Sequence, residues 1–138
     1  MTSKSKKQEL FQKTVLVIED ERPLVLAIQT KLEKSGFTVV TARTVEQGLH
    51  YLEELGGVDV IWLDHYLPGE KTGLDFVAKI KAPKSKWKKI PIFIVSNTAS
   101  NANVRTYLRL GVSKYCVKAE HRLDAIIKEI GSSLADSE

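Results

Sequence analysis

The hydrophobic positions of the chain alternate between short runs rich in β-branched residues and longer stretches with helical spacing. The short runs predict β-strands, and the longer stretches predict amphipathic helices. Strands are expected at residues 14–19, 37–42, 58–63 and 90–95, with a fifth ending at Val117. Helices are expected from Pro23 to just before Gly36 and at residues 45–55, 74–81, 103–110 and 122–134. Five such strand-and-helix units predict an α/β fold with a parallel sheet and helices on two faces.

Local signals mark several ends of these elements. Pro23 suits the first turn of a helix, Thr44 can cap the start of the second helix, and Gly56 with Gly57 can end it. The run at residues 58–63 is nearly all apolar, as expected for a central strand covered on both faces.

Length and composition indicate one globular domain. The chain has 138 residues, 43% of them hydrophobic and 28% charged, with a net charge of +4, which excludes a disordered chain or a fibre. It has no membrane-length apolar run and no secretory signal, so we expect a cytoplasmic protein that does not bind membranes. The single cysteine, Cys116, cannot form an internal disulfide and is expected to be an inert core residue.

Polar residues follow four of the five predicted strands. They are Glu19 and Asp20, Asp64, Ser96, and Lys118. In a parallel sheet these strand ends share one edge, where open α/β folds bind ligands. Taken singly, each residue has a simpler interpretation as a helix cap, a turn residue or a solvated lysine. Their combination instead predicts a site for phosphoryl transfer, with Asp64 as the acceptor.

The carboxylates of this set suit a divalent cation. Mg²⁺, or Mn²⁺, prefers oxygen ligands. We expect Asp20 and Asp64 to bind the ion directly, Glu19 to hold it through water, and the backbone carbonyl of Tyr66 to add a ligand.

The remaining two residues suit the transferred phosphoryl group, whose charge is spread over three equatorial oxygens. Lys118 can neutralise one of these oxygens, and the Ser96 hydroxyl can donate a hydrogen bond to another.

On these residues the chain resembles a response-regulator receiver domain of two-component signalling, over residues 14–134. Leu67, Pro68 and Gly73 resemble the loop that follows the acceptor in this family, and Tyr115 lies where the family carries an aromatic switch residue. The resemblance implies a doubly wound, flavodoxin-like sheet of strand order 2-1-3-4-5. It leaves residues 1–13 as a basic extension and residues 135–138 as a tail, as in a stand-alone receiver.

The resemblance also implies a function. A histidine kinase or histidine phosphotransfer protein would supply the phosphoryl group, and the domain would catalyse only its own phosphorylation and dephosphorylation. Ser96 would then move inward and Tyr115 would rotate, reshaping the face made by the fourth helix, fifth strand and fifth helix. A downstream protein would bind this face, where candidate contact residues are Val104, Tyr107, Leu108 and Tyr115.

Four residues depart from the family pattern or invite another interpretation. Ala119 replaces a proline that usually follows the lysine, Asn97 replaces a small residue, and Glu19 stands where many members have aspartate. His65 follows Asp64, but in an extended segment its side chain should point away from the site, so we expect it to be solvated or packed rather than a metal ligand.

The lysines at 79, 81, 84, 86, 88 and 89 surround Trp87. We expect a solvated loop there rather than a nucleic-acid site, since no recognition helix or stacking platform accompanies it. Trp62, in a central strand, is expected to pack against a helix. The chain is expected to be a monomer or a weak dimer.

Two other classes of protein remain as alternatives. One is a pseudo-receiver, a phosphorylation-independent interaction module, for which Asn97 and Ala119 are the only support. The other is a flavodoxin or an aspartate-nucleophile phosphatase. It is disfavoured because the first loop is acidic and because Tyr66 occupies the position where such a phosphatase has its second aspartate.

Overall fold

The computed structural model describes residues 13–98 and 100–136 and contains a five-stranded parallel sheet. The strand order is β2-β1-β3-β4-β5, and every neighbouring pair is parallel, so the expected doubly wound topology is confirmed. The strands are β1 Thr14–Ile18, β2 Thr38–Ala42, β3 Val60–Leu63, β4 Ile92–Ser96 and β5 Lys114–Val117.

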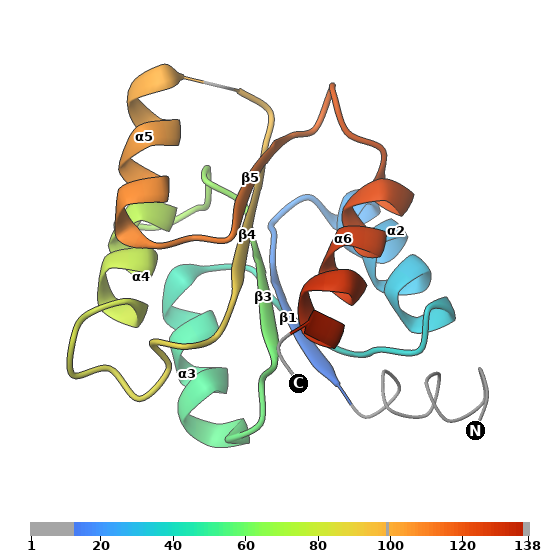
Figure 1. Cartoon of the computed structure of the whole chain (residues 1–138), viewed down its shortest axis with the longest axis horizontal. Helices are drawn as coiled ribbons and strands as arrows, with labels where there is room; N and C mark the ends of the chain where they lie inside the picture. The colour runs from blue at the N-terminus through green and yellow to red at the C-terminus, as the bar shows by residue number, and fades with distance from the viewer. Residues whose placement is uncertain (1–12, 99, 137–138) are drawn as a thin grey trace.

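Helices cover both faces of this sheet (Figure 1). They are α2 Arg22–Lys34, α3 Val45–Leu55, α4 Gly73–Ile80, α5 Asn101–Leu110 and α6 Leu123–Asp136. Figure 1 shows α2 and α6 together on one face and α3, α4 and α5 on the other. The layers are therefore helix, sheet and helix, and the chain passes from one helical layer to the other at β2 and again at β5.

The strand side chains supply two hydrophobic cores. Along β1, Leu16 and Ile18 point to the α3–α5 side, whereas Val15 and Val17 point to the α2–α6 side, and all four are fully buried. This alternation explains why the strand runs are apolar throughout. Trp62 belongs to the α2–α6 core, as expected for packing against a helix. Its Nε1 is the only buried side-chain polar atom without a hydrogen-bond partner in the described part of the chain.

Most predicted boundaries hold within two residues. Helix α3 spans the predicted residues, and the Thr44 hydroxyl accepts a hydrogen bond from the amide of Gln47 as a cap. Helix α5 begins two residues earlier than predicted, because Ser100 caps it through the amide of Asn103. Helix α6 continues through Asp136. The expected basic extension lies outside the described residues except for Lys13, as do the last two residues of the expected tail.

The start of α4 is fixed close to the sheet edge that carries the candidate site. Thr72 and Asp75 form a reciprocal capping box, in which each side chain accepts from the other residue's backbone amide. Gly73 is the first residue of the helix, and a β-carbon there would lie 3.2 Å from the carbonyl oxygen of Asp64. The absence of a side chain at Gly73 lets the helix begin directly against the segment that follows β3.

Candidate functional site

The structure brings the predicted site residues together at the carboxyl edge of the sheet. Glu19 follows β1, Asp64 follows β3, Ser96 ends β4, and Lys118 follows β5. Glu19, Asp64 and Ser96 are buried although polar. Strand geometry alone places these groups, because the sheet is parallel and the four strands lie side by side.

Glu19 is the most constrained carboxylate of the group and is only 1% exposed. Its Oε2 accepts hydrogen bonds from the amides of Asp20, at 2.9 Å, and Glu21, at 3.1 Å. Its Oε1 accepts from Nζ of Lys118 at 2.9 Å. Burial of this charge is therefore matched by a cation and two amide donors.

Lys118 connects three strand ends. Its Nζ lies 3.8 Å from Oδ2 of Asp64 in addition to its hydrogen bond with Glu19. Its backbone amide donates to the carbonyl oxygen of Ser96 at 2.7 Å. The Lys118 ammonium group thus lies near both buried carboxylates. It would contact a negatively charged group bound to Asp64.

Backbone hydrogen bonds fix the position of Asp64, but the positive charge around its carboxylate does not offset the effect of burial. Its amide donates to the carbonyl of Ile18, and its Oδ1 accepts from the amide of Tyr66 at 3.4 Å. Burial raises the pKa of Asp64 to about 7, and the Glu19 carboxylate adds to the rise. Lys118 and the Tyr66 amide act in the opposite direction but do not offset it. A further cation beside Asp64 would favour its ionised form.

Asp20 has a partner that the sequence analysis did not single out. Its Oδ1 accepts hydrogen bonds from Nε of Arg43, at 3.2 Å, and from a terminal nitrogen of the same guanidinium, at 3.1 Å. Arg43 directly follows β2, so it stands at the same sheet edge as the other site residues. That position was the available signal, because β2 and β1 are neighbours in a doubly wound sheet.

The carboxylates do not form a ready-made metal centre. Within residues 13–98 and 100–136, no group of three or more His, Cys, Asp or Glu side chains is arranged to hold a metal ion. The donor chemistry nevertheless fits Mg²⁺, since Glu19, Asp20 and Asp64 all offer oxygen. In the arrangement observed, Lys118 holds Glu19 and Arg43 holds Asp20.

Ser96 and Tyr115 share an intermediary, Thr98. The Ser96 hydroxyl is fully buried and accepts from the Thr98 amide at 3.5 Å. The Tyr115 hydroxyl donates to the Thr98 carbonyl at 2.6 Å, and the Thr98 hydroxyl donates to that of Tyr66 at 3.4 Å. The sequence analysis missed Thr98, whose only signal was its place two residues after Ser96.

The departures noted in the sequence have limited consequences here. Asn97 is exposed, and the described residues contain no cis peptide bond, so Lys118 and Ala119 are joined in trans. His65 is buried and hydrogen-bonded to Tyr107 at 2.6 Å, which confirms that it packs away from the acidic groups.

One of the predicted contact residues is placed differently. Tyr107 is fully buried and cannot present its side chain to a partner, so its inclusion among the contact residues was wrong. The helical spacing of apolar residues did not show which face of α5 is buried. Leu108, by contrast, is 51% exposed.

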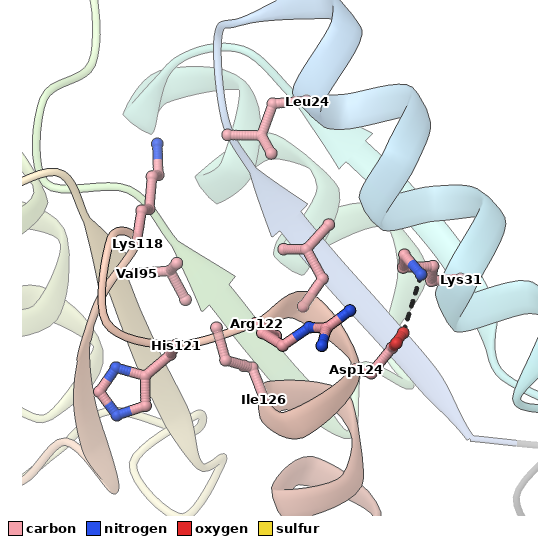
Figure 2. A pocket seen from close by; sticks show the side chains of 9 residues that line it. Leu24, Lys31, Val95, Lys118, His121, Arg122, Asp124 and Ile126 are labelled. Atoms are coloured by element: carbon pink, nitrogen blue, oxygen red, sulfur yellow. Dashed lines mark hydrogen bonds and ion pairs between the residues drawn. The ribbon is translucent and has the colours of Figure 1, made fainter.

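A pocket of about 370 Å³ lies beside Lys118, between the start of α6 and the side of α2 (Figure 2). Leu24, Val95 and Ile126 contribute apolar walls, and Lys118 and Arg122 contribute positive charge. Asp64 does not line it, so the pocket adjoins the acidic site without containing it.

Comparison with known proteins identifies the family. Residues 15–130 match the response regulator receiver domain. The chain belongs to this family. It is 32% identical over 107 residues to chemotaxis protein CheY1 of Helicobacter pylori, a match that covers 75% of this chain and 83% of CheY1. It is also 38% identical over 109 residues to the probable C4-dicarboxylate response regulator DctR of Halalkalibacterium halodurans, covering 75% of this chain and 44% of DctR.

Solved structures agree with this assignment. The phosphorylated cyanobacterial phytochrome response regulator RcpA is 26% identical, with a TM-score of 0.79 and coverage of 91% of this chain and 96% of RcpA. The Mn²⁺-bound response regulator Rcp1 shares the fold at 24% identity, with a TM-score of 0.75 and coverage of 87% and 92%.

Membership of the family sets the general function. Receiver domains act as switches in two-component signalling rather than as metabolic enzymes, and they interact with histidine kinases and downstream effectors. None of the helices within residues 13–98 and 100–136 has the length and apolarity that a membrane crossing requires.

Proposed function

We propose that this receiver domain, residues 14–134, accepts a phosphoryl group on Asp64 and signals through altered binding to a protein partner. The observation that carries the proposal is the placement of the Lys118 ammonium 3.8 Å from Asp64 Oδ2, at the sheet edge shared with Glu19 and Ser96. The similarity to RcpA, which is known in a phosphorylated form, supports it.

The transfer would use a carboxylate oxygen of Asp64 as the nucleophile. That oxygen forms a bond to phosphorus, while the bond from phosphorus to the donor's imidazole nitrogen breaks and its electron pair leaves with the imidazole, which takes up a proton. Lys118 would stabilise one phosphoryl oxygen, and the Ser96 hydroxyl would donate to another. The donor would be a histidine kinase or a histidine phosphotransfer protein.

Receiver domains generally bind Mg²⁺ or Mn²⁺, and the oxygen donors of this site fit such an ion. Glu19, Asp20, Asp64 and the backbone carbonyl of Tyr66 would hold it. When bound, the ion supplies positive charge between the carboxylates and the phosphoryl oxygens. The exposed Asp20 would exchange Arg43 for the ion, and the raised pKa of Asp64 would fall as the added charge favours its ionised form.

The signal would travel through Ser96 and Tyr115. Movement of the Ser96 hydroxyl toward a phosphoryl oxygen would break its contact with the Thr98 amide, and Thr98 also accepts from Tyr115. Rotation of Tyr115 would reshape the face made by α5, β5 and α6, on which Val104 and Leu108 remain candidate contacts. A downstream protein would bind this face.

The test is the intact mass of the protein after incubation with acetyl phosphate and Mg²⁺. The native chain should gain one phosphoryl unit, the gain should require Mg²⁺, and Asp64→Asn should show none. Asp124→Asn serves as a control, because it makes the same change at an exposed carboxylate outside the acidic site. An equal gain in Asp64→Asn would assign the phosphoryl group to another residue and contradict the proposal.

One observation favours the alternative of a phosphorylation-independent interaction module. Glu19 and Asp20 are already engaged by Lys118 and Arg43, so these two carboxylates have cationic partners without an added ion. Titration with Mg²⁺ separates the two functions. Saturable binding that is lost in Asp20→Asn supports the phosphoacceptor, whereas absence of binding together with absence of phosphorylation supports the interaction module.

A further inference from the structure

A buried hydrogen-bonded cluster joins the residue after Asp64 to helix α5. Nδ1 of His65 lies 2.6 Å from the Tyr107 hydroxyl, and Nε2 of the same ring lies 3.3 Å from Nδ2 of Asn103. Tyr107 is fully buried, and His65 is 9% exposed. Both ring nitrogens are thus committed to α5, one to its first turn and one to its middle.

The two hydrogen bonds relate the donor and acceptor roles of the two His65 ring nitrogens. When the Asn103 amide group donates to Nε2, Nδ1 carries the ring proton and donates to the Tyr107 hydroxyl oxygen. His65 is in this way a rigid spacer between β3 and α5, because rotation of its ring breaks both contacts together.

The cluster is packed tightly against the segment that carries Asp64. A β-carbon on Gly73 would lie 2.5 Å from the Tyr107 hydroxyl, 3.2 Å from the carbonyl oxygen of Asp64 and 3.3 Å from Cα of His65. The backbone at 64–65 therefore has little room to move without displacing Tyr107.

Tyr107 also contacts the switch tyrosine. The ring centroids of Tyr107 and Tyr115 are 5.8 Å apart, and those of Tyr107 and His65 are 5.5 Å apart. Tyr107 therefore contacts both His65 and Tyr115.

We propose that His65 is a positioning residue that, through Tyr107 and Asn103, couples the state of Asp64 to α5 by a route that does not pass through Ser96. The inference rests on the proposed function, because it requires Asp64 to take up a phosphoryl group. A change at Asp64 shifts the adjoining His65 backbone, and the two ring hydrogen bonds pass that shift to the first turn and the middle of α5.

The experiment compares backbone amide spectra of ¹⁵N-labelled protein before and after addition of beryllium fluoride and Mg²⁺, which imitate a bound phosphoryl group. The variants are Tyr107→Phe, which removes only the hydroxyl, and Asn103→Ala on the partly exposed first turn of α5. Tyr51→Phe is the matched control, since it removes the same group from a partly buried tyrosine of α3.

We expect the wild type and Tyr51→Phe to show shifts both around Asp64 and along α5. In Tyr107→Phe and Asn103→Ala the α5 shifts should fall at least twofold, while those next to Asp64 persist. The ¹⁵N signals of the His65 ring, followed in the same samples, should move on addition of the mimic in the wild type and much less in Tyr107→Phe. A role limited to packing would not produce this ring signature.

Two results would overturn the inference, and they are distinguishable. Full α5 shifts in both Tyr107→Phe and Asn103→Ala would refute the coupling alone, with the proposed function intact. A wild-type protein that shows no response near Asp64 would refute the proposed function and the coupling with it.

Discussion

The Tyr107 hydroxyl oxygen lies 2.5 Å from the position that a β-carbon on Gly73 would occupy. None of the three neighbours of that position can move easily, because Tyr107 is fully buried and the other two atoms belong to the backbone of Asp64 and His65. The close packing at Gly73 therefore involves three segments: the first turn of α4, the residues after β3 and the middle of α5. It depends on the absence of a side chain at Gly73.

Gly73→Ala should accordingly destabilise the fold. Overpacking of this kind costs about 1–3 kcal/mol, and we expect a loss of that size in the free energy of unfolding measured with urea. Gly131→Ala in α6 is the control, since its β-carbon would meet no atom within 4 Å. That variant should gain up to about 1 kcal/mol from helix propensity. Equal effects of the two substitutions would contradict the packing described for Gly73.

Lys118→Met should be the most destabilising single change at the site. It leaves the carboxylate of Glu19, 1% exposed, without its cation and beside the carboxylate of Asp64. Removal of one partner from a buried ion pair costs about 3–5 kcal/mol. Lys31→Met is the control, because its pair with Asp124 is largely solvent-exposed. Lys31→Met should therefore shift the urea midpoint only slightly. An equally small shift in Lys118→Met would show that the Glu19 carboxylate is solvated in solution.

The pH dependence of stability should carry the signature of Asp64. Its pKa is raised from 3.8 to about 7 in the fold, so the folded state binds a proton that the unfolded state has released between these values. The free energy of unfolding should therefore fall as pH rises from about 4 to about 7. Asp64→Asn, measured in EDTA, should lose this part of the pH dependence and be more stable than the native chain at pH 8. A pH profile shared by both proteins would contradict a pKa of Asp64 raised by burial and by Glu19.

The strands and helices were predictable from the sequence because their determinants are local, whereas the strand order came from the family resemblance. A strand covered on both faces must be apolar throughout, which marks β1, β3 and β4 directly. A polar residue at the end of such a run must then lie at the sheet edge. This reasoning brings Glu19, Asp64, Ser96 and Lys118 together without knowledge of any side-chain conformation.

Contacts that depend on side-chain conformation or on helix rotation were not predictable. The Arg43–Asp20 pair joins exposed side chains from neighbouring strand ends. The same sequence is compatible with many other conformations of these two side chains. Tyr107 and Leu108 are adjacent on α5, yet one is fully buried and the other half exposed. The rotation of α5 against the sheet decides between them, and it places Tyr107 against Gly73 and His65.

Arg43→Ala should increase the affinity of the protein for Mg²⁺. The guanidinium occupies Asp20 Oδ1 and adds a positive charge next to the position proposed for the ion, so its removal frees a ligand and lowers repulsion. The pair is solvent-exposed, which limits the expected gain to about two- to fivefold in Kd by isothermal titration calorimetry. Arg43→Lys, which keeps the charge, should gain less.

The control for this titration is Lys86→Ala, which removes an equally exposed cation from its pair with Glu53 on α3. Since Glu53 is not one of the carboxylates at the sheet edge, this variant should bind Mg²⁺ like the native chain. An equal increase in both variants would indicate a general effect of net charge. Unchanged affinity in Arg43→Ala would contradict the competition between Arg43 and the ion for Asp20.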